Sequence, residues 1–408
     1  GIHPLLIKAP LYKYNKDPTS AEHMSGYCTK HAMVCRSLLI FNNICLYTSD
    51  EVLGARAILE SQSAELLPKH PKWNRMRLLA FDGDGFAKLL VSLVEDPNNH
   101  NSSVASYIAG ECHKKSRCDI AVQELKALVG HKHIVHSMVA KAPESESWLQ
   151  LMAHMVVSVL ALNPKVVMLV HTNLDAHVLF DDNFMQHFGD RLRIVPMCIE
   201  EVASEYGFLT PWQHIKAHGN GRPFYYVHCT DFYRYLVLYI TGGTYLDTDV
   251  ILRQDLSKLE LGNSIGRESE HYVNGAYIHM VEPQSVVMKY CMESQPLTYN
   301  VWEWGCAGPM KLTSAARVFV NTTDLVVLDV NAFYSVHWSK HEQYVDQVVT
   351  DAEYEAFGQT QYGYHLWGKM MFAGLQHGQA PSIKRHSIAG RALAATCQPA
   401  IMHCLPLS

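Results

Sequence analysis

Four charged residues, Asp231, Arg234, Asp247 and Asp249, have the types and spacing that point most clearly to chemistry in this chain. Asp247 and Asp249 flank one threonine directly after a short apolar segment. In an extended strand, residues two apart point to the same side, so we expect both carboxylates to emerge together at a strand edge. Paired carboxylates suit Mn²⁺ or Mg²⁺, which commonly complete their shells with water and substrate phosphates. The implied ligand is a di- or triphosphate.

So short a match, taken alone, is more often an ordinary solvent-exposed turn, and the context of this D-x-D sequence separates it from one. Asp231 and Arg234 lie one turn apart on a predicted helix and share a face. Gly242-Gly243 then folds that helix back beside the D-x-D strand. On an open surface the pair would be an ion pair of little energetic value. Aimed into a polar crevice, it could hydrogen-bond a hydroxylated ligand.

The elements that must position these residues follow an α/β pattern from about residue 131. The patterns predict helices over Trp148–Leu162, with Ser145 or Ser147 as N-cap, around Asp182–Phe188, and over Phe224–Ile240. They predict strands over His133–Val139, Val166–Val170, Arg193–Pro196, Thr244–Leu246 and Val250–Leu252. The β-α-β order indicates a parallel sheet, which binds ligands at the carboxyl ends of its strands.

Composition excludes several classes of protein. The chain has 408 residues, enough for two to three domains, and is 48% hydrophobic and 18% charged, which excludes a largely disordered protein. With 34 basic against 39 acidic residues and no basic run, we expect no nucleic-acid partner. A membrane-spanning helix needs about 20 consecutive apolar residues, and the sequence contains no such stretch.

Eleven cysteines suggest an oxidising compartment but fix no pairing. Cys112 and Cys118 could close a short loop, while buried reduced thiols are an equal alternative. Two glycosylation sequons, at Asn101 and Asn321, weakly favour a secretory route. We divide the chain into an N-terminal extension at 1–128, mostly helical and of unknown role, and a catalytic domain at 129–408.

The segment Thr230–Val250 resembles the D-x-D segment of the Gb3 synthase-like α1,4-glycosyltransferases, the yeast initiating α1,6-mannosyltransferases and the clostridial glucosylating toxins. Further elements are similar to the α1,4-galactosyltransferase and α1,4-N-acetylglucosaminyltransferase branch (glycosyltransferase family 32-like): Tyr272–Ala276, Trp302–Pro309, Ala332–Trp338 and Tyr362–Trp367. The resemblance covers residues from about 131 to about 400. The sequence departs from the branch at Cys306, where a polar residue is usual, and at Gly368, where asparagine is usual.

The resemblance implies a GT-A (Rossmann-like) fold with one nucleotide-sugar-binding sheet flanked by helices, a UDP-sugar donor, Mn²⁺ (or Mg²⁺) and retention of anomeric configuration. Asp249 would bind the metal directly, and Asp247 would contact ribose or metal-bound water. Asp231 and Arg234 would bind donor-sugar hydroxyls. His365 would add a metal or diphosphate contact. The metal would neutralise charge that develops on the leaving UDP. In the front-face mechanism usually proposed for retaining members, a donor phosphate oxygen takes the acceptor proton, so no general base is assigned.

Positions in the matched elements supply the remaining candidates for donor binding: Tyr245, Asn274, Gly275, Trp304 and Trp367. Trp302, Trp304 and Trp338 are large aromatics of a kind more often found in the core, although an indole can stack on a sugar face. His131, His133 and His136 lack a partner set for zinc and are expected to be structural.

The leading hypothesis is a metal-dependent retaining hexosyltransferase that transfers galactose or N-acetylglucosamine from a UDP-sugar to a glycolipid or glycan hydroxyl, forming an α-linkage. Two alternatives remain open: an α-mannosyltransferase that uses GDP-mannose, and a non-catalytic nucleotide-sugar or carbohydrate-binding module. Because family members are typically anchored in the Golgi by one N-terminal helix, we expect a type II Golgi lumenal enzyme in glycosphingolipid biosynthesis, with membrane association only through an anchor outside this sequence.

Overall fold

The computed structural model describes residues 117–140, 145–259, 262–320, 325–373 and 381–408. The chain divides into two compact units, Gly1–Arg117 and Cys118–Ser408. The predicted extension at 1–128 therefore lies outside the described residues, apart from a helix at 117–128. Ala121 and Leu125 of that helix are fully buried in a core shared with later elements. Residues 118–128 of this helix thus belong to the second unit.

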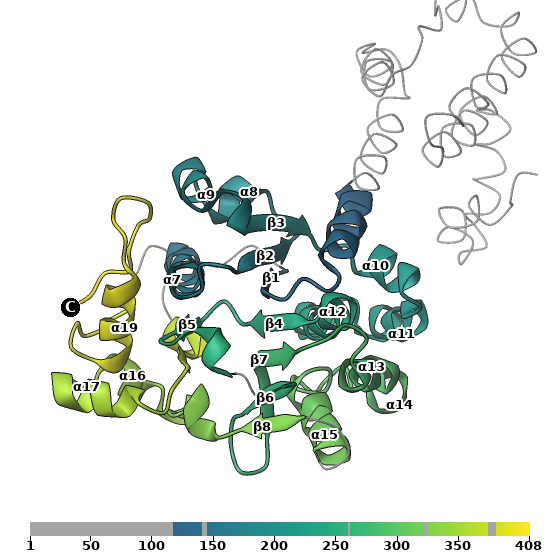
Figure 1. The fold of residues 1–408 in the computed structure, drawn as a ribbon. Helices are drawn as coiled ribbons and strands as arrows, with labels where there is room; N and C mark the ends of the chain where they lie inside the picture. The colour runs from purple at the N-terminus through teal and green to yellow at the C-terminus, as the bar shows by residue number, and fades with distance from the viewer. Residues whose placement is uncertain (1–116, 141–144, 260–261, 321–324, 374–380) are drawn as a thin grey trace, which may run out of the picture. The chain divides into compact units, whose positions relative to one another are not determined.

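A seven-stranded sheet, in the order β3-β2-β1-β4-β7-β6-β8, forms the centre of this unit (Figure 1). Its strands are β1 (Ile134–Val139), β2 (Val167–Thr172), β3 (Leu192–Pro196), β4 (Gly243–Leu246), β6 (Ser264–Arg267), β7 (Val273–Met280) and β8 (Val326–Leu328). Only β7 runs antiparallel to its neighbours. The carboxyl ends of the other six strands therefore share one edge with the beginning of β7.

Helices cover both faces of the sheet (Figure 1). One face carries α7 (Glu146–Leu162), α16 (Glu342–Val345), α17 (Asp351–Gly358) and α19 (Ile388–Thr396). The other carries α10 (Ile199–Glu205), α11 (Leu209–Gly219), α12 (Tyr225–Thr241), α13 (Val286–Glu293), α14 (Gln295–Thr298) and α15 (Pro309–Phe319). Shorter helices are α8 (Ala176–Leu179), α9 (Asp182–Phe188) and α18 (Gly368–Met371), with 3₁₀ turns η3 (Gly189–Arg191), η4 (Leu256–Leu259), η5 (Val330–Ala332) and η6 (Trp338–Lys340).

Two hydrophobic cores lie on the two faces of the sheet, and alternation along the strands divides the side chains between them. Met168 and Val170 of β2 pack in the core with α7, whereas Leu169 between them packs in the core with α12. This is the period of two expected for a strand. The predicted α/β fold, with one sheet flanked by helices, is confirmed.

Local signals explain where the two long helices begin and end. Ser145, one of the two proposed caps, accepts a hydrogen bond from the backbone N–H of Trp148 and begins α7. Gly242 ends α12 with a φ of 70°, which most L-residues rarely adopt. Strand β4 follows at once, so the helix and the segment after it lie side by side, as the sequence predicted.

The segment after β4 differs from the extended strand we predicted. Asp247 accepts a backbone hydrogen bond from Val250 at 3.1 Å, which closes a turn over the D-x-D sequence. The next strand, β5 (Val250–Leu252), leaves the main sheet and pairs antiparallel with β9 (Gly363–His365). The extended conformation expected for Asp247-Thr248-Asp249 is therefore wrong. The two carboxylates meet through a turn.

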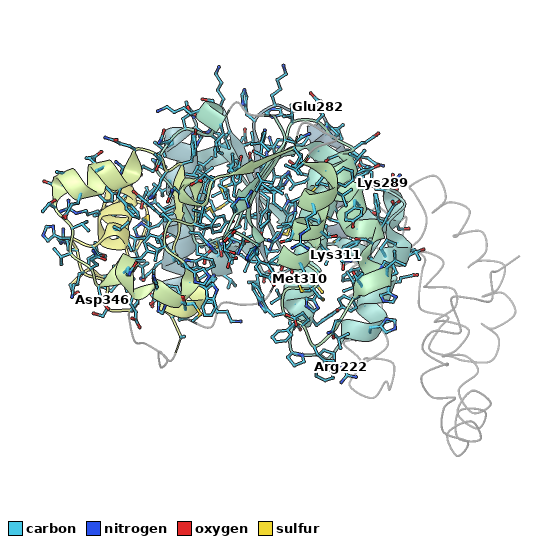
Figure 2. All side chains as sticks on the ribbon, turned by 90° about the horizontal axis from the view of Figure 1, so that it is seen from below. Arg222, Glu282, Lys289, Met310, Lys311 and Asp346 are labelled. Carbon is cyan, nitrogen blue, oxygen red and sulfur yellow. A yellow bond between two sulfur atoms is a disulfide. The ribbon has the colours of Figure 1, made fainter. Side chains whose placement is uncertain are left out.

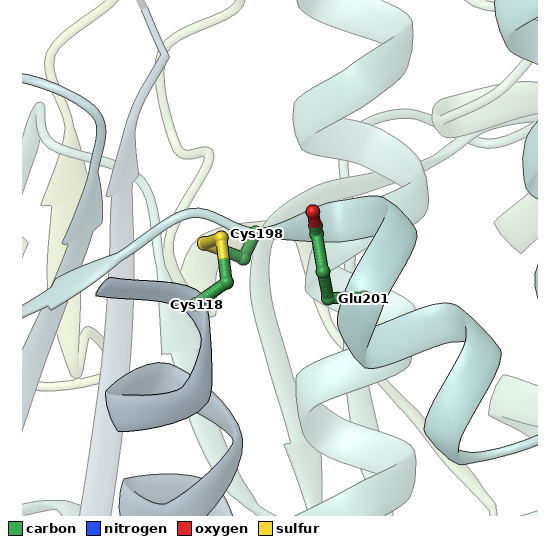
Figure 3. Close-up of side chains that lie close together, drawn as sticks. All are labelled: Cys118, Cys198 and Glu201. Atoms are coloured by element: carbon green, nitrogen blue, oxygen red, sulfur yellow. A yellow bond between two sulfur atoms is a disulfide. The ribbon is translucent and has the colours of Figure 1, made fainter. Parts of the chain in front are cut away.

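Two disulfides stabilise the described part of the chain. Cys118 pairs with Cys198, beside Glu201 of α10 (Figure 3), and Cys397 pairs with Cys404. The proposed loop between Cys112 and Cys118 is therefore wrong, since Cys118 is bonded elsewhere; Cys112 and both sequons lie outside the described residues. Within those residues, no helix combines the length and apolar character that a bilayer span requires.

Candidate functional site

The D-x-D turn brings a third possible metal ligand into contact with its two carboxylates. Ligand atoms of Asp247, Asp249 and His365 all lie within 4.8 Å of one another. His365 comes from β9, which pairs with β5 directly after the turn, with Val250 opposite His365. The antiparallel pairing of these two short strands thus positions the histidine that the sequence placed more than a hundred positions away.

Asp249 is held firmly by its surroundings. One of its oxygens lies 3.3 Å from Nε2 of His365, and the other accepts the backbone N–H of Gly368 at 2.7 Å. Burial would raise the pKa of Asp249, but the His365 charge and these hydrogen bonds hold that pKa below its ordinary value. Burial alone would lower the pKa of His365, and Asp249 raises it instead. The carboxylate is therefore ionised and ready to bind a cation.

Trp367 shapes the backbone that reaches Asp249. It adopts a left-handed conformation with a φ of 56°, which is uncommon and costly for a bulky residue. This conformation points the next N–H, that of Gly368, at the Asp249 carboxylate. The Trp367 indole is buried, donates to the carbonyl of Val336 at 2.7 Å and contacts the His365 ring, with centroids 4.1 Å apart. Trp367 thus positions Asp249 and His365.

The second group of the site is centred on Arg234. Its guanidinium lies 3.1 Å from Asp231 and 3.4 Å from Asp247, and it stacks over the ring of Tyr245. The Tyr245 hydroxyl donates to Asp247 at 2.7 Å. The pair on α12 and the D-x-D turn, predicted to face each other, thus form one connected network.

Asp231 and Arg234 are both buried, and each keeps an unpaired polar atom. Asp231 Oδ2 and Arg234 Nε have no hydrogen-bond partner among the described residues. Burial raises the pKa of Asp231 to about 7, against the opposing effect of Arg234. Unpaired buried polar atoms require an explanation, and a polar ligand that completes their hydrogen bonds would supply one.

Two glycines allow this buried network to form. A Cβ at Gly275 would stand 2.1 Å from Nη1 of Arg234, and a Cβ at Gly308 would stand 2.5 Å from Oδ2 of Asp231. Both distances are far below any real carbon contact. The Asn-Gly and W-x-W-G-x-x-G-P elements therefore contribute bare backbone, against which the charged side chains pack.

Asn274 lies at the beginning of β7 and connects the D-x-D turn with a carboxylate that the sequence reasoning missed. The side-chain NH₂ of Asn274 donates to Glu268 at 2.6 Å, and the side-chain oxygen Oδ1 accepts from the backbone N–H of Ala276. The Ala276 carbonyl accepts from the N–H of Asp247. Glu268 directly follows β6, four residues before the recognised Tyr272–Ala276 element, and the turn between β6 and β7 brings it to Asn274.

The tryptophans expected mainly in the core are exposed instead. Trp302, Trp304 and Trp338 are 62%, 42% and 43% exposed. Trp302 and Trp304 lie in the turns between α14 and α15. Arg222, labelled in Figure 2, stacks on Trp302 at 4.8 Å. The core expectation was wrong because the motif forms turns, which hold their side chains at the surface.

The two departures from the family pattern have structural reasons. The contact to Asp249 comes from the backbone N–H of Gly368, which any residue except proline could supply, and a Cβ there would meet the Trp148 ring at 2.9 Å. Cys306 is buried and donates to the carbonyl of Asn300 at 3.0 Å.

His136, expected to be structural, is buried and hydrogen-bonded to His171 and Thr241.

Two family models match consecutive parts of the chain. Residues 146–272 match the glycosyltransferase sugar-binding region containing the DXD motif. Residues 280–403 match the alpha 1,4-glycosyltransferase conserved region. The first match contains Asp231, Arg234 and the D-x-D turn, and the second contains Gly308 and His365. Together they cover more than half of the chain and almost all of the described unit.

Curated relatives agree with these matches. Mouse lactosylceramide 4-alpha-galactosyltransferase is 27% identical over 185 residues, which are 43% of this chain and 50% of that protein. Human alpha-1,4-N-acetylglucosaminyltransferase is 25% identical over 152 residues, 35% of this chain and 42% of that protein. The chain thus spans about half the length, or less, of these relatives.

Solved structures with partial similarity include mouse xyloside xylosyltransferase 1, 13% identical, covering 57% of this chain and 97% of that one, with a TM-score of 0.37. The galactosyltransferase LgtC is 11% identical and covers 57% of this chain and 86% of that one, with a TM-score of 0.35. Scores this low do not establish a shared fold. The mixed sheet and the D-x-D turn at its edge agree with the GT-A fold implied by the family. The chain therefore contains the DXD-containing sugar-binding region and the alpha 1,4-glycosyltransferase conserved region of a hexosyltransferase.

Proposed function

We propose that this chain is a metal-dependent glycosyltransferase that moves a hexose from a nucleotide sugar to a hydroxyl of a glycan or glycolipid. One observation carries the proposal: Asp231, Arg234, Asp247, Asp249 and His365 converge at one sheet edge from three separate segments. A surface ion pair would not require three carboxylates, an arginine and an imidazole to be brought together at this point.

The donor set fits a divalent cation. Asp247, Asp249 and the imidazole of His365 offer two oxygens and one nitrogen, which suit Mn²⁺ better than the all-oxygen shell that Mg²⁺ prefers. A bound metal would neutralise the diphosphate charge that develops as the donor bond breaks. Asp249 would be the main ligand because it is buried and kept ionised.

The donor sugar would lie against Asp231 and Arg234. The unpaired Asp231 Oδ2 and Arg234 Nε offer an acceptor and a donor to hydroxyl groups. Tyr245 fixes Asp247 and the guanidinium at the same time. Galactose or N-acetylglucosamine from UDP is the proposed donor, with retention of configuration, since the curated relatives are named for transferring these two sugars.

We also propose a compartment of the secretory pathway, in keeping with the Golgi expectation. The support is the pair of disulfides, Cys118–Cys198 and Cys397–Cys404, because such bonds persist in oxidising compartments and are rare in the cytosol.

A donor assay tests the function. Release of UDP is measured from UDP-galactose and UDP-N-acetylglucosamine, with and without Mn²⁺, for wild type, Asp249→Asn and Asp346→Asn. Asp346→Asn is the control. It makes the same chemical change at an exposed residue at the end of α16 (Figure 2), far from the D-x-D turn in sequence. We expect Mn²⁺-dependent release from one donor, lost in Asp249→Asn and kept in Asp346→Asn.

Other results would support the alternatives. Turnover of GDP-mannose in place of either UDP-sugar would identify a mannosyltransferase. Nucleotide binding without transfer to a broad acceptor panel would indicate a non-catalytic module. Equal activity of Asp249→Asn and wild type would refute the metal-site assignment.

A further inference from the structure

The mechanism proposed above leaves Glu268 without a role, although it lies at the same sheet edge as the D-x-D turn. It follows β6 and begins the short loop that leads into β7. Its side chain is only 14% exposed. A largely covered carboxylate at the carboxyl end of a strand is placed for ligand contact.

Glu268 uses only part of its hydrogen-bonding capacity. Oε2 accepts the Asn274 amide at 2.6 Å, whereas Oε1 faces Nε2 of His337 at 3.9 Å, too far for a hydrogen bond. Nδ1 of His337 accepts from the backbone N–H of Ser339, so in the neutral ring the proton lies on Nε2. A hydroxyl oxygen between the two side chains could accept from His337 and donate to Glu268.

An exposed indole adjoins this pair. Trp338 is 43% exposed, and its ring stands beside that of His337, with centroids 5.2 Å apart. The segment is fixed to the metal site because Trp367 donates to the carbonyl of Val336. A flat apolar ring beside a hydroxyl-binding pair is the combination that holds a sugar, whose ring faces are apolar and whose edges carry hydroxyls.

The donor-sugar residues lie on the other side of β7. A Cβ at Gly275 would point at Arg234, and neighbouring residues of a strand point to opposite faces, so the Asn274 side chain points away from Arg234 and toward Glu268. A donor sugar at Asp231 and Arg234 and a second ligand at Glu268 would therefore flank the same strand start from opposite sides.

We propose that Glu268, His337 and Trp338 form the acceptor-sugar subsite. Glu268 and His337 bind one hydroxyl of the acceptor, and Trp338 stacks on its ring. The inference rests on the proposed glycosyltransferase function and names a specificity site for it.

Binding of model glycosides tests the subsite. Methyl β-lactoside, methyl β-galactoside and methyl β-N-acetylglucosaminide are titrated into wild type, Glu268→Gln, Trp338→Ala and Trp338→Phe in the presence of Mn²⁺ and UDP. The control is Glu270→Gln, which removes an exposed carboxylate from the same loop. We expect Glu268→Gln and Trp338→Ala to weaken glycoside binding about tenfold or more, because a charged hydrogen bond or a stacking face is lost. Trp338→Phe keeps a ring and should retain part of the affinity, and Glu270→Gln should match wild type.

The affinity for UDP, measured on the same samples, separates this subsite from the donor site. It should change by less than about twofold in all four variants, which also confirms that they fold. Glycoside binding that is equal in wild type, Glu268→Gln and Trp338→Ala would overturn the proposal, as would UDP-loaded wild type that binds none of the glycosides. Absence of UDP binding, with glycoside binding still weakened by Glu268→Gln, would count against the proposed function and leave the subsite standing.

Discussion

Gly308→Ala perturbs the site at one defined contact. The new Cβ would stand 2.5 Å from Oδ2 and 2.6 Å from Cγ of Asp231. Contacts of a real Cβ below 3.0 Å essentially do not occur, so one group must move by at least about half an ångström. The Gly308 backbone is fixed because its carbonyl accepts the Tyr235 hydroxyl at 3.0 Å. The carboxylate of Asp231 should therefore move, away from Arg234.

The size of the effect follows from that displacement. A displacement of about 1 Å in a positioning group can cost about a hundredfold in rate. A displacement of about half an ångström therefore predicts a loss of about tenfold to a hundredfold in kcat/KM. Overpacking a buried site should also lower the free energy of unfolding by about 1–3 kcal/mol. Activity is assayed as transfer per folded protein, and stability by urea unfolding, so that the two effects separate.

Gly305→Ala is the matched control in the same W-x-W-G-x-x-G-P element. A Cβ at Gly305 would meet nothing closer than Met310 Cγ at 3.7 Å, an ordinary contact. We expect wild-type activity and stability from this variant. Full activity in Gly308→Ala, or equal losses in both variants, would refute the claim that Asp231 must keep its position against Gly308.

Three further predictions concern the site, the pH response and the disulfides. Arg234→Lys should lower kcat/KM about tenfold or more with unchanged circular dichroism, because lysine cannot contact two carboxylates and stack on a tyrosine together; an active lysine variant would contradict this. Burial lowers the pKa of His154 to about 4, so the free energy of unfolding should fall by about 3 kcal/mol as the pH drops from about 6.5 to 4. Urea unfolding at pH 7, 5 and 4 should show a smaller fall in His154→Gln than in wild type. Equal falls in the two proteins would refute this prediction. Cys118→Ser should lower the free energy of unfolding by about 2 kcal/mol more than Cys397→Ser, because the two disulfides join residues 80 and 7 positions apart in the sequence. Calorimetry that gives the reverse order would contradict this loop-entropy argument.

The sequence predicted the elements well because their signals are local. Periodicity, the Ser145 cap and the Gly242 stop placed α7, α12 and the strands of the β-α-β unit close to their observed bounds. The one-turn spacing of Asp231 and Arg234 also predicted their shared face, since a helix fixes that geometry.

Features that depend on distant pairing were not predictable. The D-x-D sequence forms a turn because β5 leaves the main sheet to pair with β9, which lies more than a hundred residues away. Glu268 meets Asn274, six residues later, through the turn between β6 and β7, two strands that the sequence analysis did not predict. The exposure of Trp338 also depends on the tertiary structure around its short turn, and residue type alone suggested burial.

The most direct test of the account is calorimetric titration of UDP with and without Mn²⁺, comparing wild type with Asp249→Asn. The structure places Asp247, Asp249 and His365 around one point, so UDP binding should require Mn²⁺ in wild type and be lost or metal-independent in the variant. Identical, metal-independent binding by the two proteins would contradict the assignment of this sheet edge as the nucleotide-sugar site.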